Sequence, residues 1–398
     1  GSYSWTLPSL NSSTVTLRIT ASDTAGNIKT VTSAANFLID STAPTVTMTD
    51  PSGPLRGANS VTLAYSASDA NTLSALQLSY ASDGVNFGTA TSLSVGSTSS
   101  SWTIPSDNTS AAKLKLTATD IAGNVSTSTT NAFIIDSTAP AVAITTPTGP
   151  LKGGSSVTIN YSSSDANTVS SLQLAYASDG TNFGTPTTLS VGSTSTSWSV
   201  PSDNTANAKL KLIATDTAGN INSVLTSAFI IDSTAPSAPS IARISGASSN
   251  STSVNLNTVC TSDYDKVLYS TSSSTPTTSD AAWESCASSK TFVVSAGDGV
   301  KTIYAFTKDV AGNISTSSNI TMTLDTTAPS APVANLTSAA ISSSTVATFT
   351  ISDCLDRPYV FVSESMVAPA ASDSAWQACS TTANAISYTL IGPVTQSA

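Results

Sequence analysis

One pattern repeats along the sequence with a period close to 96 residues, and this repetition limits the folds that the chain can adopt. Copies of the pentapeptide Asp-[Ser/Thr]-Thr-Ala-Pro end at Pro44, Pro140, Pro236 and Pro329. The motif Asp-x-Ala-Gly-Asn keeps the same phase and begins at Asp23, Asp120, Asp216 and Asp309. Segments 44–139 and 140–235 align without a gap, and most of their positions are identical. The chain therefore consists of copies of one duplicated structural unit.

Alternation of apolar and polar residues predicts β-strands throughout each repeat. The clearest case is 113–119, where Leu114 and Leu116 fall on one face of an extended chain and polar residues on the other. In segment 44–139 we expect seven strands, at 46–49, 61–66, 76–81, 87–93, 101–104, 113–119 and 131–135. Short strands separated by turns in a repeat of this length are typical of an immunoglobulin-like sandwich. We predict an all-β fold in which the matching residues Trp102 and Trp198 anchor the core.

The two motifs have physical reasons to punctuate the strands. In Asp-x-Ala-Gly-Asn the glycine can adopt a positive φ and the aspartate can accept turn N–H bonds, which predicts a hairpin between the sixth and seventh strands. In Asp-[Ser/Thr]-Thr-Ala-Pro the proline has a fixed φ and no N–H to donate, so it ends the strand ladder and begins a short linker. Short linkers restrict the angle between neighbours. We therefore expect a tandem array of sandwiches that forms an elongated rod.

The motifs also set the expected domain boundaries. Residues 1–43 should hold the C-terminal strands of an incomplete repeat, and 329–398 the N-terminal part of another. Complete repeats should occupy 44–139, 140–235 and 236–328.

All four cysteines lie in the last two of these segments. Cys260 and Cys286 belong to one, Cys354 and Cys379 to the other, and the second member of each pair follows the shared pattern Asp-x-x-Trp-x-x-Cys. Matching pairs in homologous repeats predict one disulfide within each domain, and stable disulfides indicate an oxidising compartment. Buried free thiols are the alternative. A zinc site is disfavoured because the chain has neither His nor Cys-x-x-Cys.

The two motifs, at this spacing, resemble those of the bacterial immunoglobulin-like repeats that build large surface adhesins and other exported bacterial proteins. The resemblance covers essentially the whole chain. It implies an immunoglobulin-like fold and a bacterial cell-surface or extracellular location. It identifies no single function, because such repeats serve as stalks, spacers and binding tips alike.

Composition excludes several other classes of protein. The chain has no histidine, which excludes Ser-His-Asp and Cys-His nucleophiles and histidine-ligated metal catalysis. Its 14 basic residues are scattered among 24 acidic ones, so no basic stripe can hold nucleic acid. No apolar run approaches the roughly 18 residues of a membrane span.

We predict no catalytic residues. The acids that depart from the repeat, beside the first cysteine of each pair, are interpreted as loop residues: Asp263, Asp265, Asp353 and Asp356.

Calcium is the one cofactor that the sequence leaves open. In adhesins of the resembled kind Ca²⁺ stiffens the domain junctions, and junctional aspartates supply oxygen ligands. Here Asp69 or Asp165 could approach a junction from a loop. The aspartates that precede the linkers are Asp40, Asp136, Asp232 and Asp325. Ca²⁺ takes about six to eight oxygens, and we count only one or two acids at each junction. Turn capping is therefore the preferred role of these aspartates, and calcium binding is the alternative.

These observations predict a non-catalytic extracellular protein, which serves as a stalk, an adhesin segment or a fibre subunit. One alternative is an array of carbohydrate-binding modules, which would need exposed aromatic side chains, whereas the five tryptophans are interpreted as core residues. Another is an accessory region of a larger exported enzyme. The expected partners are a cell-surface or glycan ligand, or further copies of the chain.

The incomplete repeats at 1–43 and 329–398 allow two explanations. Our preferred one is that the sequence is a window of a longer repeat protein. In the other, the C-terminal fragment of one copy accepts the N-terminal strands of the next, because an incomplete sandwich exposes unpaired strand edges. Such head-to-tail pairing would propagate as an open filament.

Overall fold

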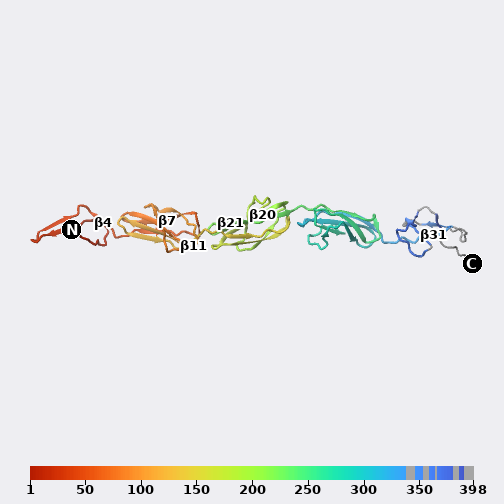
Figure 1. Cartoon of the computed structure of the whole chain (residues 1–398), viewed down its shortest axis with the longest axis horizontal. Helices are drawn as coiled ribbons and strands as arrows, with labels where there is room; N and C mark the ends of the chain where they lie inside the picture. The colour runs from red at the N-terminus through yellow and green to blue at the C-terminus, as the bar shows by residue number, and fades with distance from the viewer. Residues whose placement is uncertain (338–345, 353–357, 364, 380–384, 390–398) are drawn as a thin grey trace. The chain divides into compact units, whose positions relative to one another are not determined.

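The computed structural model describes residues 1–337, 346–352, 358–363, 365–379 and 385–389. Every secondary-structure element assigned among these residues is a β-strand (Figure 1), which confirms the predicted all-β fold. No helix in this part of the chain is long and apolar enough to cross a membrane. The chain divides into two compact units, residues 1–234 and 235–398, which are described separately.

The segment 44–139 folds into two facing sheets. The three-stranded sheet has the order β10-β7-β5 and is antiparallel throughout. Its strands are β5 (Thr45–Met48), β7 (Ser60–Ser68) and β10 (Ser99–Thr103). The larger sheet has the order β6-β13-β11-β8-β9, with β12 paired to β11, and only the β6–β13 pair is parallel. Its strands are β6 (Leu55–Arg56), β8 (Leu73–Ala81), β9 (Thr91–Leu93), β11 (Thr109–Asp120), β12 (Val125–Thr129) and β13 (Phe133–Asp136).

The core lies between the two sheets, and its inward side chains come from strict alternation along β11. Leu114 and Leu116 are fully buried, opposite Leu63 of β7 in the same cluster. Burying each such side chain contributes about 1.5–3 kcal/mol to folding. Trp102 packs against this cluster, with its ring edge-on to Phe133 at 6.1 Å. The predicted core role of Trp102 is thus confirmed.

The segment 140–235 repeats this architecture strand for strand. Its three-stranded sheet consists of β14 (Ala141–Ile144), β16 (Ser156–Ser164) and β19 (Ser195–Ser199). Its larger sheet consists of β15 (Leu151–Lys152), β17 (Val169–Ala177), β18 (Thr187–Leu189), β20 (Thr205–Asp216), β21 (Ile221–Leu225) and β22 (Phe229–Asp232). Trp198 takes the place of Trp102 and packs on the equivalent core.

The first segment of the chain, residues 1–43, contains two strand pairs. They are β1 (Ser12–Val15) with β4 (Phe37–Ile39) and β2 (Arg18–Ser22) with β3 (Ile28–Thr32). The Asp-x-Ala-Gly-Asn hairpin between β2 and β3 forms as predicted. The Asp23 carboxylate accepts the backbone N–H groups of Ala25 at 3.0 Å and Asn27 at 2.8 Å, and Gly26 takes a φ of 85°. Hydrogen bonds from the side chain and backbone of Asn27 hold the pKa of Asp23 below its usual value.

The second unit contains one full pair of sheets and part of another. The first pair comprises β23 (Ser240–Arg243), β25 (Ser253–Val259) and β28 (Ser289–Val293), facing β24 (Ser248–Ser249), β26 (Lys266–Ser270), β27 (Glu284–Ser285), β29 (Gly299–Lys308) and β30 (Ser318–Leu324). The remaining strands are β31 (Val333–Leu336), β32 (Val346–Ser352), β33 (Tyr359–Val360), β34 (Gln377–Ala378) and β35 (Ala385–Thr389).

The structure corrects the predicted strand count of the repeat. Seven strands were expected in 44–139, but β6 and β12 are present as well. The hairpin motif therefore joins β11 to β12 rather than to the last strand of the repeat. Both extra strands lack the apolar alternation used for the prediction. β6 has only two residues, and β12 has the sequence Val-Ser-Thr-Ser-Thr with its side chains exposed or half-buried.

The interpretation of all five tryptophans as core residues is also wrong. Trp5 is 48% exposed. Trp283 is half-buried in a turn just before β27, where its indole N–H donates to the carbonyl of Thr277 at 2.7 Å. Trp376 occupies the same place before β34 and donates in the same way to Ala370 at 2.9 Å. These two side chains hold a loop together, a role that sequence position alone does not distinguish from core packing.

The linker that leaves segment 44–139 is fixed to that segment. The backbone N–H of Ser137 donates to Asn108 at 2.8 Å, and its hydroxyl donates to the carbonyl of Asp107 at 3.0 Å. Ser137 can approach this closely because Gly57 has no side chain: a Cβ there would lie 2.0 Å from the Ser137 hydroxyl oxygen. Gly153 and Ser233 repeat the arrangement in the next segment.

We predict that Gly57→Ala loosens this linker. The added methyl group must displace Ser137 and would also lie 2.9 Å from the Cα atom of Ser106, at a cost of about 1–3 kcal/mol. Hydrogen–deuterium exchange should then be faster at the amides of Ser137 and Thr138 than in the unmodified chain. Gly88→Ala is the matched control, since a Cβ at Gly88 meets only a carbonyl oxygen at 3.7 Å. Equal exchange in the two variants would contradict the steric argument.

Cys260 and Cys286 form a disulfide with their Cα atoms 5.8 Å apart. Cys354 lies outside the described residues, so the second pairing has no structural description. We predict both pairings, Cys260–Cys286 and Cys354–Cys379, for the protein in an oxidising environment. Peptide mapping without reduction should recover each pair within its own repeat. Closing either loop stabilises its domain by roughly 3 kcal/mol in the loop-entropy model. Free thiols, or a bridge between the two repeats, would overturn the assignment.

Candidate metal centre

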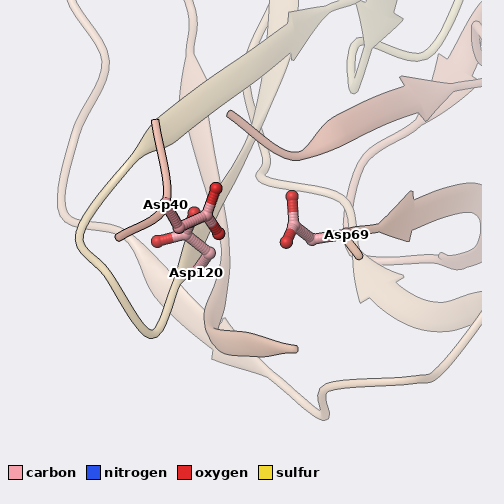
Figure 2. Close-up of side chains that lie close together, drawn as sticks. All are labelled: Asp40, Asp69 and Asp120. Atoms are coloured by element: carbon pink, nitrogen blue, oxygen red, sulfur yellow. The ribbon is translucent and has the colours of Figure 1, made fainter. Parts of the chain in front are cut away.

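Three aspartates meet where segment 44–139 is followed by segment 140–235. Asp136 ends β13, Asp165 lies in the loop after β16, and Asp216 ends β20. One carboxylate oxygen from each lies within 4.8 Å of the others. Asp40, Asp69 and Asp120 form the same cluster one repeat earlier, where Figure 2 draws the three carboxylates close together. We call these the 136 cluster and the 40 cluster.

Asp216 is placed by the hairpin that it begins. Its carboxylate accepts the backbone N–H of Asn220 at 2.8 Å and the Asn220 side-chain amide at 2.8 Å. The same amide also donates to the carbonyl of Asp136 at 3.0 Å. Because Asp136 belongs to the preceding segment, one buried asparagine joins the hairpin of one repeat to the end of the other. Asn124 makes the equivalent bonds to Asp120 and Asp40.

Asp165 is placed by a strained loop. Its carboxylate accepts the backbone N–H of Asn167 at 2.8 Å, which closes a tight turn. The following residue, Thr168, has a φ of 83°, and Thr72 in the earlier repeat has a φ of 92°. A positive φ is costly for a β-branched residue and indicates a conformation that the surrounding structure imposes. The carbonyl of Thr168 accepts the N–H of Thr217, so the hairpin holds the loop in place.

Asp136 has a buried oxygen without a partner. Its Oδ1 accepts the backbone N–H of Thr138 at 3.0 Å, as expected for a turn cap. Its Oδ2 has no hydrogen-bond partner in the described structure, although the residue is only 1% exposed. A buried carboxylate oxygen left unpaired costs several kcal/mol unless a positive charge is bound nearby.

The charge of each cluster is not balanced by the protein. Within the described residues the ion pairs are Lys266–Asp265 and Lys290–Glu284, and both lie in the second unit. Arg56 lies beside Asp136 in the β6–β13 register but donates to the carbonyl of Gly219 at 3.2 Å. Burial raises the pKa of Asp120, but hydrogen bonds from the side chain and backbone of Asn124 outweigh it, and the pKa is lowered. Asp120 is therefore ionised at neutral pH.

This donor set fits a hard cation. Three carboxylates supply oxygen ligands only, which suits Ca²⁺ or Mg²⁺ rather than a metal that prefers nitrogen or sulfur. Asp120, Asp136 and Asp216 are each at most 2% exposed, so their charges are poorly screened by solvent. Asp136 belongs to the cluster, and its buried Oδ2, which has no hydrogen-bond partner, is available as a ligand.

The sequence identified four of the six cluster residues, Asp40 and Asp136 with Asp69 and Asp165, and assigned them to turn capping before calcium binding. The capping bonds are present, for example from Thr42 to Asp40 at 3.0 Å. The count of one or two acids at each junction was wrong, because the hairpin aspartates Asp120 and Asp216 were not recognised as neighbours of the linker. No sequence signal marks this neighbourhood, because the contact between the Asn124 side chain and the carbonyl of Asp40 joins residues that are 84 positions apart.

The other aspartates singled out from the sequence have structural roles where they are described. Asp325 accepts the N–H of Thr327 at 3.2 Å and caps its turn. Asp263 accepts the backbone N–H and the hydroxyl of Ser237, and Asp265 pairs with Lys266 at 3.8 Å. Asp232 likewise accepts the N–H of Thr234 at 2.9 Å. Asp353 and Asp356 lie outside the described residues.

Comparison with known protein families identifies the repeats. The family model described as "Bacterial Ig-like domain" matches residues 57–137 and 152–233. These two repeats are bacterial Ig-like domains. No curated protein matches the chain. The bacterial Ig-like repeats support a non-catalytic structural or adhesive role at the level of the fold.

Solved structures similar to the chain include segments of bacterial adhesins. One is a Ca²⁺-stabilized adhesin that helps an Antarctic bacterium reach out and bind ice, with 16% identity over 78% of this chain and 80% of that one, at a TM-score of 0.38. Another is a 1.5-MDa bacterial ice-binding adhesin, with 14% identity over 71% of this chain and 97% of that one, and a TM-score of 0.32. A tetra-tandem repeat from the extending region of a large adhesion protein has 19% identity over 78% of this chain and 81% of that one, with a TM-score of 0.26.

We predict that Asp165→Asn stabilises the cation-free chain. Asparagine keeps the oxygen that accepts the Asn167 N–H but removes one of three like charges. If about 1 kcal/mol of repulsion is relieved, the Tm of the first unit in EDTA should rise by roughly 2–4 °C. Differential scanning calorimetry measures this. Asp265→Asn, which removes an exposed charge from the second unit, should leave the Tm of the first unit unchanged. A lower Tm for Asp165→Asn would show that the carboxylates do not repel one another.

Proposed function

We propose that this chain is a non-catalytic extracellular spacer or adhesive segment whose domain junctions are fixed by Ca²⁺. The observation that carries the proposal is that Asp136, one of three clustered aspartates, has a buried Oδ2 without a hydrogen-bond partner. Asp136 comes from one repeat, whereas Asp165 and Asp216 come from the next. A cation held by all three therefore resists separation or rotation of the two domains.

Calcium fits this site better than magnesium. Mg²⁺ demands nearly ideal octahedral geometry and gives up its water reluctantly, whereas Ca²⁺ accepts irregular sets of oxygens. The ligands here come from a linker, a loop and a hairpin, so their geometry depends on how two domains meet. An irregular set of this kind favours Ca²⁺. The Asp side chains bind and orient the ion, and water completes its coordination.

The expected affinity suits an extracellular setting. Extracellular calcium modules bind with Kd values of about 10⁻⁴–10⁻³ M. A junction with a Kd of about 0.1 mM would gain roughly 1.4 kcal/mol of resistance to opening in about 1 mM Ca²⁺. This is enough to change the fraction of open junctions about tenfold. The Cys260–Cys286 disulfide agrees with an oxidising, extracytoplasmic location.

The rigid attachment of the linkers supports a spacer role. Ser137 and Ser233 are each bonded to the domain that they leave. On the other side, Asn124 and Asn220 bond the following hairpin to the linker aspartate. Ca²⁺ would complete this contact by balancing the charge. We infer that an array of this kind holds a binding partner, such as a cell-surface or glycan ligand, at a distance from the bacterial surface.

The proposal predicts a local response to calcium. Adding about 1 mM Ca²⁺ to the chelated full chain should slow hydrogen–deuterium exchange in the hairpin 216–220 and the linker 136–140. Calorimetry should show a higher Tm for the first unit. The control is the double variant Asp69→Asn/Asp165→Asn, in which both responses should be strongly reduced. Exchange that is unchanged by Ca²⁺ in the unmodified chain would refute the proposed role of the junctions.

A further inference from the structure

The two clusters consist of three aspartates at equivalent positions of two repeats, but they differ in the residues around them. We propose that the 136 cluster binds Ca²⁺ about tenfold more tightly than the 40 cluster, and that residues 71 and 217 set this difference. The inference rests on the proposed function, because it concerns the affinity of the same sites. It implies that the junctions of one chain fill in order as the Ca²⁺ concentration rises.

In the 40 cluster a side-chain amide competes with the cation. Asn71 donates its backbone N–H to Asp69 at 2.8 Å, and its side-chain Nδ2 donates to Oδ2 of Asp40 at 2.9 Å. The oxygen that is unpartnered in Asp136 is therefore occupied in Asp40. A cation that takes this oxygen must displace the amide, and hydrogen bonds to charged groups are stronger than those between neutral groups.

In the 136 cluster the corresponding asparagine is held differently. Asn167 donates its backbone N–H to Asp165 at 2.8 Å, just as Asn71 does to Asp69. Its carbonyl, however, accepts the hydroxyl of Thr217 at 2.8 Å. Within the described structure Oδ2 of Asp136 has no donor, so Asn167 does not occupy it. The aspartate oxygen stays free for a cation.

The residue that differs is the variable position of the hairpin motif. Thr217 in one repeat corresponds to Ile121 in the other. Both residues donate a backbone N–H to the carbonyl of the strained threonine in the loop, at 3.1 Å for Thr217 and 3.2 Å for Ile121. Only Thr217 can add a hydroxyl bond to the asparagine carbonyl. Position 217 therefore restrains the loop that carries Asn167, whereas the loop of Asn71 lacks this restraint.

Burial acts in the same direction. Asp136 is 1% exposed, whereas Asp40 is only half-buried. Charges repel more strongly where solvent screens them less, so the cation-free 136 cluster is the less favourable of the two. A cation relieves more repulsion there. The free oxygen and the deeper burial both predict tighter binding at the 136 cluster.

The test is a calcium titration of the full chain with one readout for each junction. Hydrogen–deuterium exchange is followed separately in the hairpins 120–124 and 216–220 over a range of Ca²⁺ concentrations. We expect the midpoint for 216–220 to be about tenfold lower than that for 120–124. Asn71→Ala should lower the midpoint for 120–124 several-fold, because the competing amide is gone. Asn167→Ala is the matched control and should move the midpoint for 216–220 by less than twofold.

A second variant tests position 217 without changing side-chain volume. Thr217→Val should raise the midpoint for 216–220 toward that of the other junction and leave 120–124 unchanged. Slow exchange in the core strands β11 and β20 confirms that each variant is folded. Equal midpoints in the unmodified chain, or a lower one for 120–124, would overturn this inference and leave the proposed function standing. A chain that responds to Ca²⁺ at neither hairpin would overturn both.

Discussion

In the first unit, one asparagine side chain couples each of the two complete repeats to the segment before it. The Nδ2 group of Asn220 donates both to Asp216 of its own hairpin and to the carbonyl of Asp136. This contact brings the hairpin aspartate against the linker aspartate, and the loop of Asp165 joins them because Thr168 is bonded to the same hairpin. The cluster exists only while this docking holds. Its geometry is therefore a property of two domains together.

Docking of the hairpin creates an electrostatic conflict as well as a contact. Three carboxylates converge in a place where solvent is largely excluded, and Arg56 is engaged with the carbonyl of Gly219. The loop that supplies the third carboxylate holds a threonine at positive φ. Strain and unbalanced charge persist in a folded protein when the surrounding structure imposes them or a ligand offsets them. Both features point to the junction, rather than the core, as the functional part of each repeat.

The repeats are not interchangeable, although most of their residues are identical. A change from Ile121 to Thr217 adds one hydroxyl, and that hydroxyl bonds to Asn167. In the other repeat, Asn71 bonds to Asp40 instead. Duplication preserves the strands because each copy needs the same core, whereas a surface position in a hairpin can vary freely. Variation at that position can tune a junction without altering the domain.

The strands and turns of the complete repeats could largely be predicted from the sequence alone. Alternating residues such as Leu114 and Leu116 define the sandwich, and the two motifs define its turns, because strand pattern and turn chemistry are local. Strands without an apolar face, such as β12, form only because a neighbour offers an edge. The candidate metal centre, in contrast, depends on the tertiary structure. Each aspartate caps its own turn, and nothing local indicates that residues 136, 165 and 216 meet. They meet because a hairpin of one domain docks on the linker of another. The period of the sequence repeat does not indicate this contact.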